Sequence, residues 1–407
     1  MNPEVLADRA AAVLNKLCLE IPGRSVGSLG NREATAYFAK EMAALGLDVE
    51  YREFDCIDWH GGDVRLEAGG EAFEALASPY SQGYQARAPL AVATAVDELE
   101  ASELAGKILL LHGEIAAEQL MPKNFQFYNP EHHQHIIRLL EEKEPTAIVA
   151  ATSMNPGIAG ALYPFPLIED GDFDIPSVYM KDVDGQRLAQ HARQEVILEF
   201  EAERLPVKGY NVVARKGGEF GRRVVACAHI DAKAGTPGAL DNASGVAILL
   251  LLAELMQDYA GELGLEMVAL NGEDYYAAPG EMLYLKDNEG KMDEILLAIN
   301  SDGTGYKQGN SVYSLYGCPA EITSAIHDAF SGREGVAEGP PWYQSDHSIF
   351  IQQGRPALAI TSEQLDDLWT RIAHTEHDRP ENIDPGKLVV LAQALRDLVL
   401  DLDRLGL

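Results

Sequence analysis

The chain has 407 residues, of which 46% are hydrophobic and 24% are charged. That composition is typical of a soluble globular protein, and the length is too great for one ordinary core. The 64 acidic and 32 basic side chains give a formal net charge of −32, which argues against nucleic acid or an anionic membrane as a partner because phosphates would be repelled.

The N-terminus and the cysteines set the expected compartment. The N-terminal stretch MNPEVLADRAAAVLNKLCLE is acidic and lacks the basic start and apolar core of a signal peptide. The longest apolar run, VAILLLLAELM, is too short to span a bilayer. The cysteines show no CxxC pair and no dense spacing, so we expect reduced thiols and a cytoplasmic protein without a membrane span. They are Cys18, Cys56, Cys227 and Cys318.

The first half of the chain predicts two helices and then an inserted domain. The helices are expected near residues 3–19 and 31–46, and LDVEYREFD reads as a strand after them. Short strand patterns such as GKILLLHG and IPSVYM follow, separated by Gly, Pro and acidic turns, with one helix between Pro130 and Glu144. These features predict a smaller β-rich domain at residues 61–204.

From residue 205 onward the pattern becomes strand, loop and helix in alternation. The predicted strands are VVACAH, LEMVALN, EILLAIN, SVYSLYG and RPALAI, and the predicted helices lie near 242–260, after Pro279, at 319–330 and at 385–404. Nearly continuous apolar strands that alternate with helices indicate an α/β fold. We expect a mostly parallel mixed sheet sandwiched by helices, formed by residues 1–60 and 205–407.

Polar side chains gather where these strands end. Sheets of this kind bind ligands just beyond the carboxyl ends of their strands, and four separate segments place only imidazoles and carboxylates there. The residues are His229, Asp231, Glu273, Asp274, Asp302 and His374. One such histidine would be unremarkable, but four coordinated placements without any Lys or Arg indicate a common site.

A divalent cation is the natural counter-charge for this group, because clustered carboxylates repel one another. Two histidines with several acids suit zinc-like metals better than calcium or magnesium. The candidate ligands are His229, Asp241, Asp274, Asp302 and His374. Five ligands exceed a closed tetrahedral site, whereas one shared carboxylate would serve two metals and leave room for a bridging water. Glu273 points away from its neighbour Asp274 in extended backbone, so it can face that water and take its proton.

These residues and their surrounding motifs resemble the two-zinc aminopeptidases of metallopeptidase family 28. The resemblance rests on His229-x-Asp231, Asp241-Asn242-x-Ser244-Gly245, Glu273-Asp274, Asp302 and His374-Thr375. GRSVGSLGNREATAYFAKEMAALGLDVE (23–50) looks like the opening of that family, and SDHSIF (345–350) looks like its late motif. The segment 61–204 is similar, more weakly, to the protease-associated domain often inserted ahead of the catalytic half.

The resemblance implies a role for each ligand. His229 and Asp302 would bind one zinc ion, Asp274 and His374 would bind the other, and Asp241 would bridge the two. Other divalent metals could take the place of zinc.

The resemblance also implies the residues that act beside the ligands. Glu273 would be the general base and then the acid that protonates the leaving amine. Asp231 would hold His229 by a hydrogen bond that fixes its tautomer. The peptide bond between Asp241 and Asn242 would be cis.

The chain departs from the family pattern at two positions. Asp274 stands where Glu is frequent, and Ala373 stands where several members have a tyrosine that stabilises the oxyanion. Another donor must then serve, and Tyr343 and Tyr306 are the candidates.

The expected function is therefore that of a metallo-aminopeptidase acting on peptide substrates. A zinc carboxypeptidase or deacylase of related fold and a non-enzymatic, receptor-like relative are the alternatives. The complete ligand set disfavours a single-zinc cyclase. The sequence leaves the side-chain preference of the substrate open, and also whether the chain forms a homo-oligomer.

Two further motifs have ordinary interpretations. His132, His133 and His135 lie on one predicted helix with no evident acidic partner nearby, which favours a solvated or capping cluster over a second metal site. The run 345–347 (SDH) contains the residue types of a hydrolase triad, but residues that close in sequence cannot easily form the relay, and no G-x-S-x-G elbow precedes them.

Overall fold

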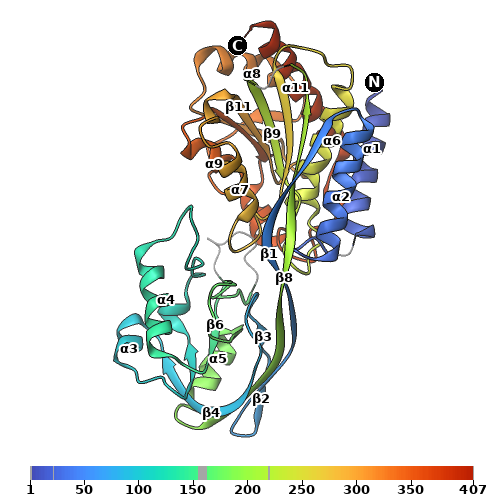
Figure 1. Ribbon diagram of the computed structural model, residues 1–407. Coiled ribbons are helices and arrows are strands. Elements are labelled where there is room, and N and C mark those ends of the chain that lie inside the picture. Colours follow the sequence, from blue (N-terminus) through green and yellow to red (C-terminus); the bar gives the residue numbers. More distant parts are fainter. Residues whose placement is uncertain (1, 22, 155–162, 219–220, 407) are drawn as a thin grey trace. The chain divides into compact units, whose positions relative to one another are not determined.

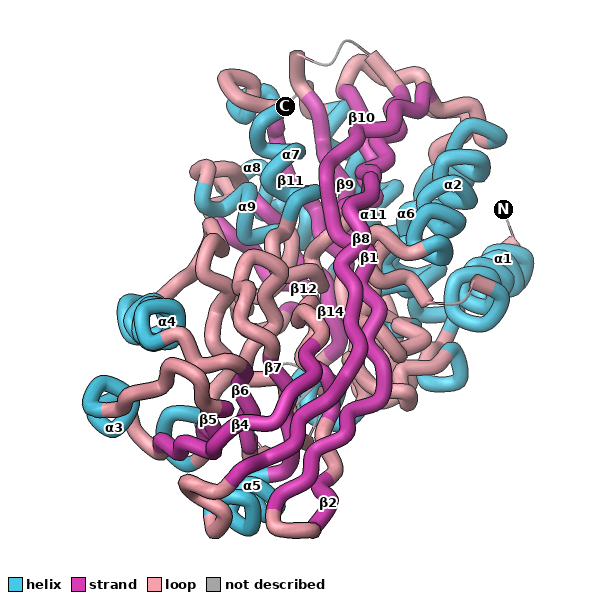
Figure 2. The backbone as a smooth tube through the Cα atoms, turned by 60° about the horizontal axis from the view of Figure 1, so that its bottom comes forward, coloured by secondary structure: helices cyan, strands magenta, loops and turns pink. Residues whose placement is uncertain are grey.

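The computed structural model describes residues 2–21, 23–154, 163–218 and 221–406. The chain forms two compact units: unit 1 is Met1–Cys56 with Lys208–Leu407, and unit 2 is Ile57–Val207. These boundaries lie a few residues from those placed by the sequence at 60/61 and 204/205. The long strands β1 (Asp48–Ala68) and β8 (Glu195–Lys216) pair with each other and continue from one unit into the other (Figures 1 and 2).

Unit 1 is built on a mixed sheet in the order β13-β12-β14-β11-β9-β10-β8. β9 runs parallel to β10 and β11, and β11 runs parallel to β14, whereas β8 and β12 are antiparallel to their neighbours β10 and β14. The expected mostly parallel mixed sheet is thereby confirmed. The strands are β9 (Arg223–His229), β10 (Gly264–Leu270), β11 (Ile295–Ser301), β12 (Ser311–Tyr316), β13 (Val336–Glu338) and β14 (Ala357–Ser362).

Helices cover both faces of this sheet, as Figure 1 shows. One face carries α1 (Pro3–Asn15), α2 (Leu29–Ala44), α6 (Ser244–Leu255), α8 (Ala320–Phe330) and α11 (Pro385–Arg404). α7 (Pro279–Asp287) and α9 (His347–Gln352) lie on the other, and α10 (Leu365–Arg371) follows β14. Short helical turns complete unit 1: η1 (Lys16–Glu20), η3 (Ala239–Ala243), η4 (Met292–Glu294) and η5 (Pro380–Asn382). Within the described chain, each helix is too short or too polar to cross a membrane.

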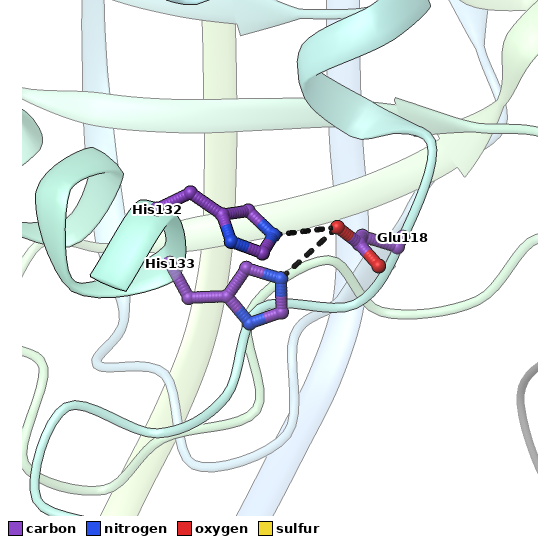
Figure 3. A group of neighbouring side chains, drawn as sticks. All are labelled: Glu118, His132 and His133. Carbon is purple, nitrogen blue, oxygen red and sulfur yellow. Dashed lines mark hydrogen bonds and ion pairs between the residues drawn. The ribbon is translucent and has the colours of Figure 1, made fainter. Parts of the chain in front are cut away.

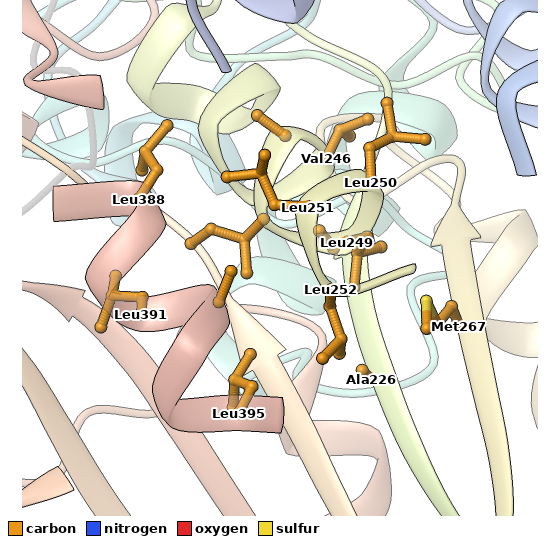
Figure 4. Packing of buried hydrophobic residues seen from close by; sticks show 14 of the residues in the cluster. Ala226, Val246, Leu249, Leu250, Leu251, Leu252, Met267, Leu388, Leu391 and Leu395 are labelled. Atoms are coloured by element: carbon orange, nitrogen blue, oxygen red, sulfur yellow. The ribbon is translucent and has the colours of Figure 1, made fainter. Parts of the chain in front are cut away.

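Helix α6 forms the centre of the core of unit 1. Its sequence VAILLLLA is apolar on every side, and each of these residues is buried, because the helix packs between β9 on one side and α1, α2 and α11 on the others. Figure 4 shows leucines of α6 beside Leu388, Leu391 and Leu395 of α11. This packing fixes the first turn of α6 against the sheet, and that turn directly follows η3.

The strand register brings the carboxyl ends of the central strands to one edge. β9 and β10 pair as far as His229 and Leu270, and β11 and β14 pair as far as Ser301 and Ile360. The loops that follow these strands therefore start side by side, which is the placement that the sequence predicted for its polar residues.

Unit 2 contains more helix than the sequence indicated. Its sheet has the order β8-β4-β5-β6-β7-β3, with β4 to β7 parallel. The expected helix is α4, but α3 and α5 are also present; at six and eight residues they are too short for helical periodicity to stand out. The elements are β2 (Glu71–Phe73), β3 (Leu76–Ala77), β4 (Tyr84–Ala93), α3 (Val96–Ala101), β5 (Ile108–Leu111), η2 (Gly113–Ala116), α4 (Glu131–Lys143), β6 (Ala147–Thr152), β7 (Ser177–Lys181) and α5 (Asp182–Ala189). Its likeness to a protease-associated domain stays a prediction.

Candidate metal centre

The five predicted ligands come together from five segments of unit 1. His229 is the last residue of β9, and Asp241 lies in η3, just before α6. Asp274 lies in the loop after β10, Asp302 directly follows β11, and His374 follows α10. His374 adopts a left-handed backbone with φ of 58°, a conformation that non-glycine residues rarely adopt and that concentrates at functional sites.

Asp241 lies between the two histidines with one carboxylate oxygen toward each. Its Oδ1 is 3.1 Å from His229 Nε2, and its Oδ2 is 2.9 Å from His374 Nε2. Each histidine faces one further carboxylate: His229 Nε2 is 3.6 Å from Asp302 Oδ1, and His374 Nε2 is 2.9 Å from Asp274 Oδ1. The site thus consists of two histidine–aspartate pairs that share one carboxylate.

Several donor atoms of this cluster are buried and lack hydrogen-bond partners. Within the described residues, both ring nitrogens of His229, Oδ2 of Asp241 and Oδ1 of Asp302 are buried without such a partner. One donor atom from each of His229, Asp241 and Asp274 lies within 4.8 Å of the others. Buried polar atoms are normally paired, and imidazole nitrogens with carboxylate oxygens are the donors that zinc prefers. The residues present therefore fit a metal.

The charges of the cluster are strongly coupled. Burial alone would lower the pKa of His229 and of His374, but the facing carboxylates outweigh it and raise both pKa values well above the usual range. Burial alone would raise the pKa of Asp241, but its contacts with both histidines lower it. A divalent cation placed here would displace protons from the imidazoles.

Asp231 has a different contact from the one expected. Its carboxylate is 3.7 Å from His229 Nδ1, so the expected hydrogen bond to that ring is not formed. Both oxygens accept backbone hydrogen bonds instead, from the N–H of Gly272 at 2.8 Å and of Asp274 at 3.0 Å. Through these two hydrogen bonds Asp231 holds the loop that carries Glu273 and Asp274.

Glu273 lies between those two bonded amides, at the start of the loop after β10. Burial raises the pKa of its carboxyl group well above the usual range, with further contributions from Asp274 and Asp302. A carboxyl group whose pKa is moved toward neutrality is suited to accept and return a proton.

Asp378 is a buried residue of the site that the sequence reasoning missed. Its Oδ1 and Oδ2 accept hydrogen bonds from the backbone N–H of Leu240 at 2.7 Å and of Asp241 at 3.0 Å. Its backbone carbonyl accepts another from Ala239 at 3.1 Å. The only sequence signal was its position in IAHTEHD, four residues after His374.

The Asp241–Asn242 peptide is cis, as the resemblance implied.

The two tyrosines proposed as oxyanion donors contact residues other than the five ligands, and their role stays a prediction. The Tyr306 hydroxyl contacts Asp367 Oδ2 at 3.5 Å. Tyr343 is 60% exposed and packs edge-on against Tyr316. In the described part of the chain, neither forms a hydrogen bond or ion pair with the five ligands.

The SDH run supports the site and does not form a triad. Ser345 accepts a hydrogen bond from Asn300 Nδ2 at 2.8 Å and hydrogen-bonds to Asp302. His347 Nε2 lies 2.8 Å from the Trp342 carbonyl. Asp346 is buried beside Glu281, and burial raises its pKa to about 7.

The histidines of α4 in unit 2 form a cluster with Glu118, which the sequence did not reveal as their partner. Figure 3 shows both imidazoles directed at this carboxylate, with His132 Nε2 at 2.9 Å and His133 Nε2 at 3.2 Å from Oε1. His133 Nδ1 accepts the backbone N–H of Met121 at 3.1 Å. A neutral imidazole has one acceptor nitrogen, so Nε2 carries the proton and cannot ligate a metal in this arrangement. His135 pairs separately with Glu100 at 2.9 Å.

Comparison with known proteins finds peptidases that resemble this chain. The sequence model described as "Peptidase family M28" matches residues 211–399. A protein of Aspergillus oryzae named "probable leucine aminopeptidase 2" is 24% identical over 387 residues, which cover 87% of this chain and 73% of that protein.

Two solved structures share the fold over nearly the whole chain. An aminopeptidase from Aneurinibacillus sp. strain AM-1 superposes with a TM-score of 0.74 at 21% identity, over 97% of this chain and 93% of that one. A zinc aminopeptidase from Bacillus subtilis superposes with a TM-score of 0.72 at 20% identity, over 97% and 94% of the two chains.

Proposed function

Residues 211–399 belong to peptidase family M28, and from this premise we propose that the protein is a two-zinc aminopeptidase. The observation that carries the proposal is the position of Asp241, whose two carboxylate oxygens each face a different histidine. A carboxylate in that position serves two cations at once, whereas a single closed tetrahedral site needs one ligand fewer than the five present.

The ligands divide into two sets around Asp241. His229 and Asp302 would hold one ion, Asp274 and His374 would hold the other, and Asp241 would bridge them, as the distances within each set favour. When bound by these residues, two zinc ions would lower the pKa of a bound water and polarise the scissile carbonyl.

Glu273 transfers the proton during hydrolysis of the peptide bond. Glu273 accepts a proton from the attacking water and returns it to the nitrogen of the leaving amine, so that the peptide bond breaks and the carboxylate is regenerated. Asp231 keeps Glu273 in place, because its carboxylate bonds the amides on both sides of that residue.

The charge of the protein favours a substrate with a free amino terminus. The carboxylates of the cluster would be balanced by the two cations that they hold, so the charge that remains is the net −32 of the whole protein. A field of this sign attracts an ammonium group and repels a C-terminal carboxylate. Removal of N-terminal residues is therefore the peptidase activity that the site supports best.

The proposal is tested with a panel of matched peptides and with metal analysis. The metal-free protein receives zinc in steps, and turnover is measured on aminoacyl substrates with free and with acetylated amino termini. We expect two bound zinc ions per chain and turnover of the free peptides only. Turnover confined to blocked substrates would instead support a carboxypeptidase or deacylase, and an absence of bound metal would support a non-enzymatic relative.

A further inference from the structure

Arg24 is a buried arginine whose guanidinium donates four hydrogen bonds to backbone carbonyls. It is 2% exposed and donates to the carbonyls of Ile230 at 3.0 Å, Pro237 at 2.8 Å and Gly238 at 2.7 Å, and to that of Leu17 at 2.9 Å. Among the described residues no carboxylate forms an ion pair with it within 4 Å. The planar fork of a guanidinium can hold several acceptors in fixed relative positions.

Three of these carbonyls belong to the loop that joins two predicted ligands. Ile230 directly follows His229, and Gly238 precedes Asp241 by three positions, so one guanidinium binds both ends of the loop. At Gly238 the approach is so close that a Cβ atom would lie 2.7 Å from Arg24 Nη2 and 2.6 Å from the Asp241 carbonyl. Glycine at position 238 therefore allows the backbone of the loop to approach the guanidinium of Arg24.

Asn31 makes a corresponding contact with the other ligand loop. Its side-chain amide exchanges two hydrogen bonds with that of Asn271, at 2.8 and 3.0 Å. It also donates to the Arg24 carbonyl at 3.0 Å, which joins the two contacts into one unit. Asn271 is the residue before Gly272, where the loop with Glu273 and Asp274 begins. The side chains of Arg24, Asn31 and Asn271 are buried.

We propose that Arg24 and Asn31 are positioning residues of the metal centre. The segment 23–31, which contributes no ligand, fixes the loop between His229 and Asp241 and the base of the loop with Asp274. The inference rests on the proposed metal site. A ligand set that is held in place before binding does not have to be ordered by the metal. Loss of the contacts made by Arg24 and Asn31 should therefore weaken metal binding.

The experiment compares Arg24→Lys with a matched control, Arg223→Lys. Arg223 is equally buried, at 3% exposure, and donates to Glu294 and Asn288. It is the first residue of β9, whereas His229 is the last, so it lies at the far end of the same strand. Zinc dissociation constants are measured by competition with a chelator of known affinity, and thermal unfolding is measured on the same metal-free samples.

We expect Arg24→Lys to weaken zinc binding by about 10- to 100-fold, the usual effect of removing a group that orients metal ligands. Asn31→Ala should weaken it in the same direction. Arg223→Lys should lower thermal stability and leave zinc affinity unchanged. Equal zinc affinities in the wild type, Arg24→Lys and Arg223→Lys proteins would overturn the proposal.

Hydrogen exchange on the unaltered protein gives a second test that needs no variant to fold. Zinc should increase protection of the amides in 23–31 together with those in 230–241, and leave the first residues of β9 unchanged. Protection limited to 230–241 would contradict a role for the N-terminal segment. A wild-type protein that binds no zinc would refute the proposed function itself, whereas normal zinc binding with an insensitive Arg24→Lys variant would refute only this inference.

Discussion

The carboxylate of Asp378 accepts the backbone N–H of Asp241 with a distance of 3.0 Å between nitrogen and Oδ2. Asp378 thus holds the main chain of Asp241, the acid between the two histidines. Asp378 itself is not one of the five candidate ligands. Burial raises the pKa of Asp378 to about 7, and the charge of Asp241 adds to that effect. A cation bound by Asp241 would offset the charge of that carboxylate and so favour the ionised form of Asp378, which accepts both amides.

Asp378→Asn should weaken zinc binding by about 10- to 100-fold. The amide group has the size of the carboxyl group, but its NH₂ must face one of the two backbone N–H donors, Leu240 or Asp241. Competition with a chelator measures the effect, and Asp328→Asn on α8 serves as a control at a site away from the loop. An unchanged affinity would show that the two amide bonds do not position Asp241.

Removal of the shared carboxylate should affect both metal sites, whereas removal of an unshared one should affect only one. We expect Asp302→Ala to retain one tightly bound zinc ion per chain and Asp241→Ala to retain none, because Asp241 faces both histidines. Elemental analysis after dialysis against a weak chelator measures the stoichiometry. If the two variants retained the same number of ions, Asp241 would not be a bridging ligand.

Glu273→Gln should separate metal binding from chemistry. The amide cannot take a proton from water, so turnover of a free aminoacyl substrate should fall by roughly 100- to 10,000-fold. Because Glu273 is not one of the five clustered ligands, the variant should still bind two zinc ions. Full metal content with turnover close to that of the wild type would remove Glu273 from the role of base.

Zinc should stabilise the protein more at pH 8 than at pH 5. Burial raises the pKa values of Asp346 and Asp378 to about 7, whereas an unfolded aspartate titrates near about 3.9. Their contribution to the stability of the metal-free protein is complete below about pH 4 and is lost as the pH rises through about 7.

Zinc reverses this dependence because it requires neutral imidazoles and ionised carboxylates. The rise in Tm on addition of zinc, measured by calorimetry at both pH values, should therefore be larger at pH 8. In metal-free Asp346→Asn protein the decline in Tm between pH 5 and pH 8 should be smaller than in the wild type. A larger zinc effect at pH 5 would contradict the prediction.

The grouping of the five candidate ligands could be predicted from the sequence because several of them lie at the end of a strand or just before a helix whose pattern is plain, whereas their role as ligands stays a prediction. His229 ends a strand of apolar residues, and Asp241 precedes the apolar helix α6. Once the strands are parallel, their register alone brings such positions together. The expected fold class is confirmed, and the family model that matches residues 211–399 agrees with the expected family and peptidase activity, whereas the cytoplasmic location stays a prediction.

The supporting residues could not be found in the same way. Arg24, Asn31 and Asp378 act through backbone groups of distant loops, and a main-chain hydrogen bond leaves no residue pattern at its acceptor. The contacts of Asp231 are of the same kind: its carboxylate is 3.7 Å from His229 Nδ1 and accepts the backbone N–H groups of Gly272 and Asp274. The short helices α3 and α5 of unit 2 also contain too few residues to show a period.

The dispersal of the site along the chain determines when it can exist during synthesis. Arg24 emerges from the ribosome early, His229 about midway, and His374 with Asp378 only after most of the chain has been made. The proposed site needs Arg24, the loop between His229 and Asp241, and His374 together. A nascent chain that lacks any of them therefore has no complete site. A ribosome-bound fragment that stops before His374 would thus lack one of the five candidate ligands, and we expect it to bind metal more weakly than the chain that contains His374.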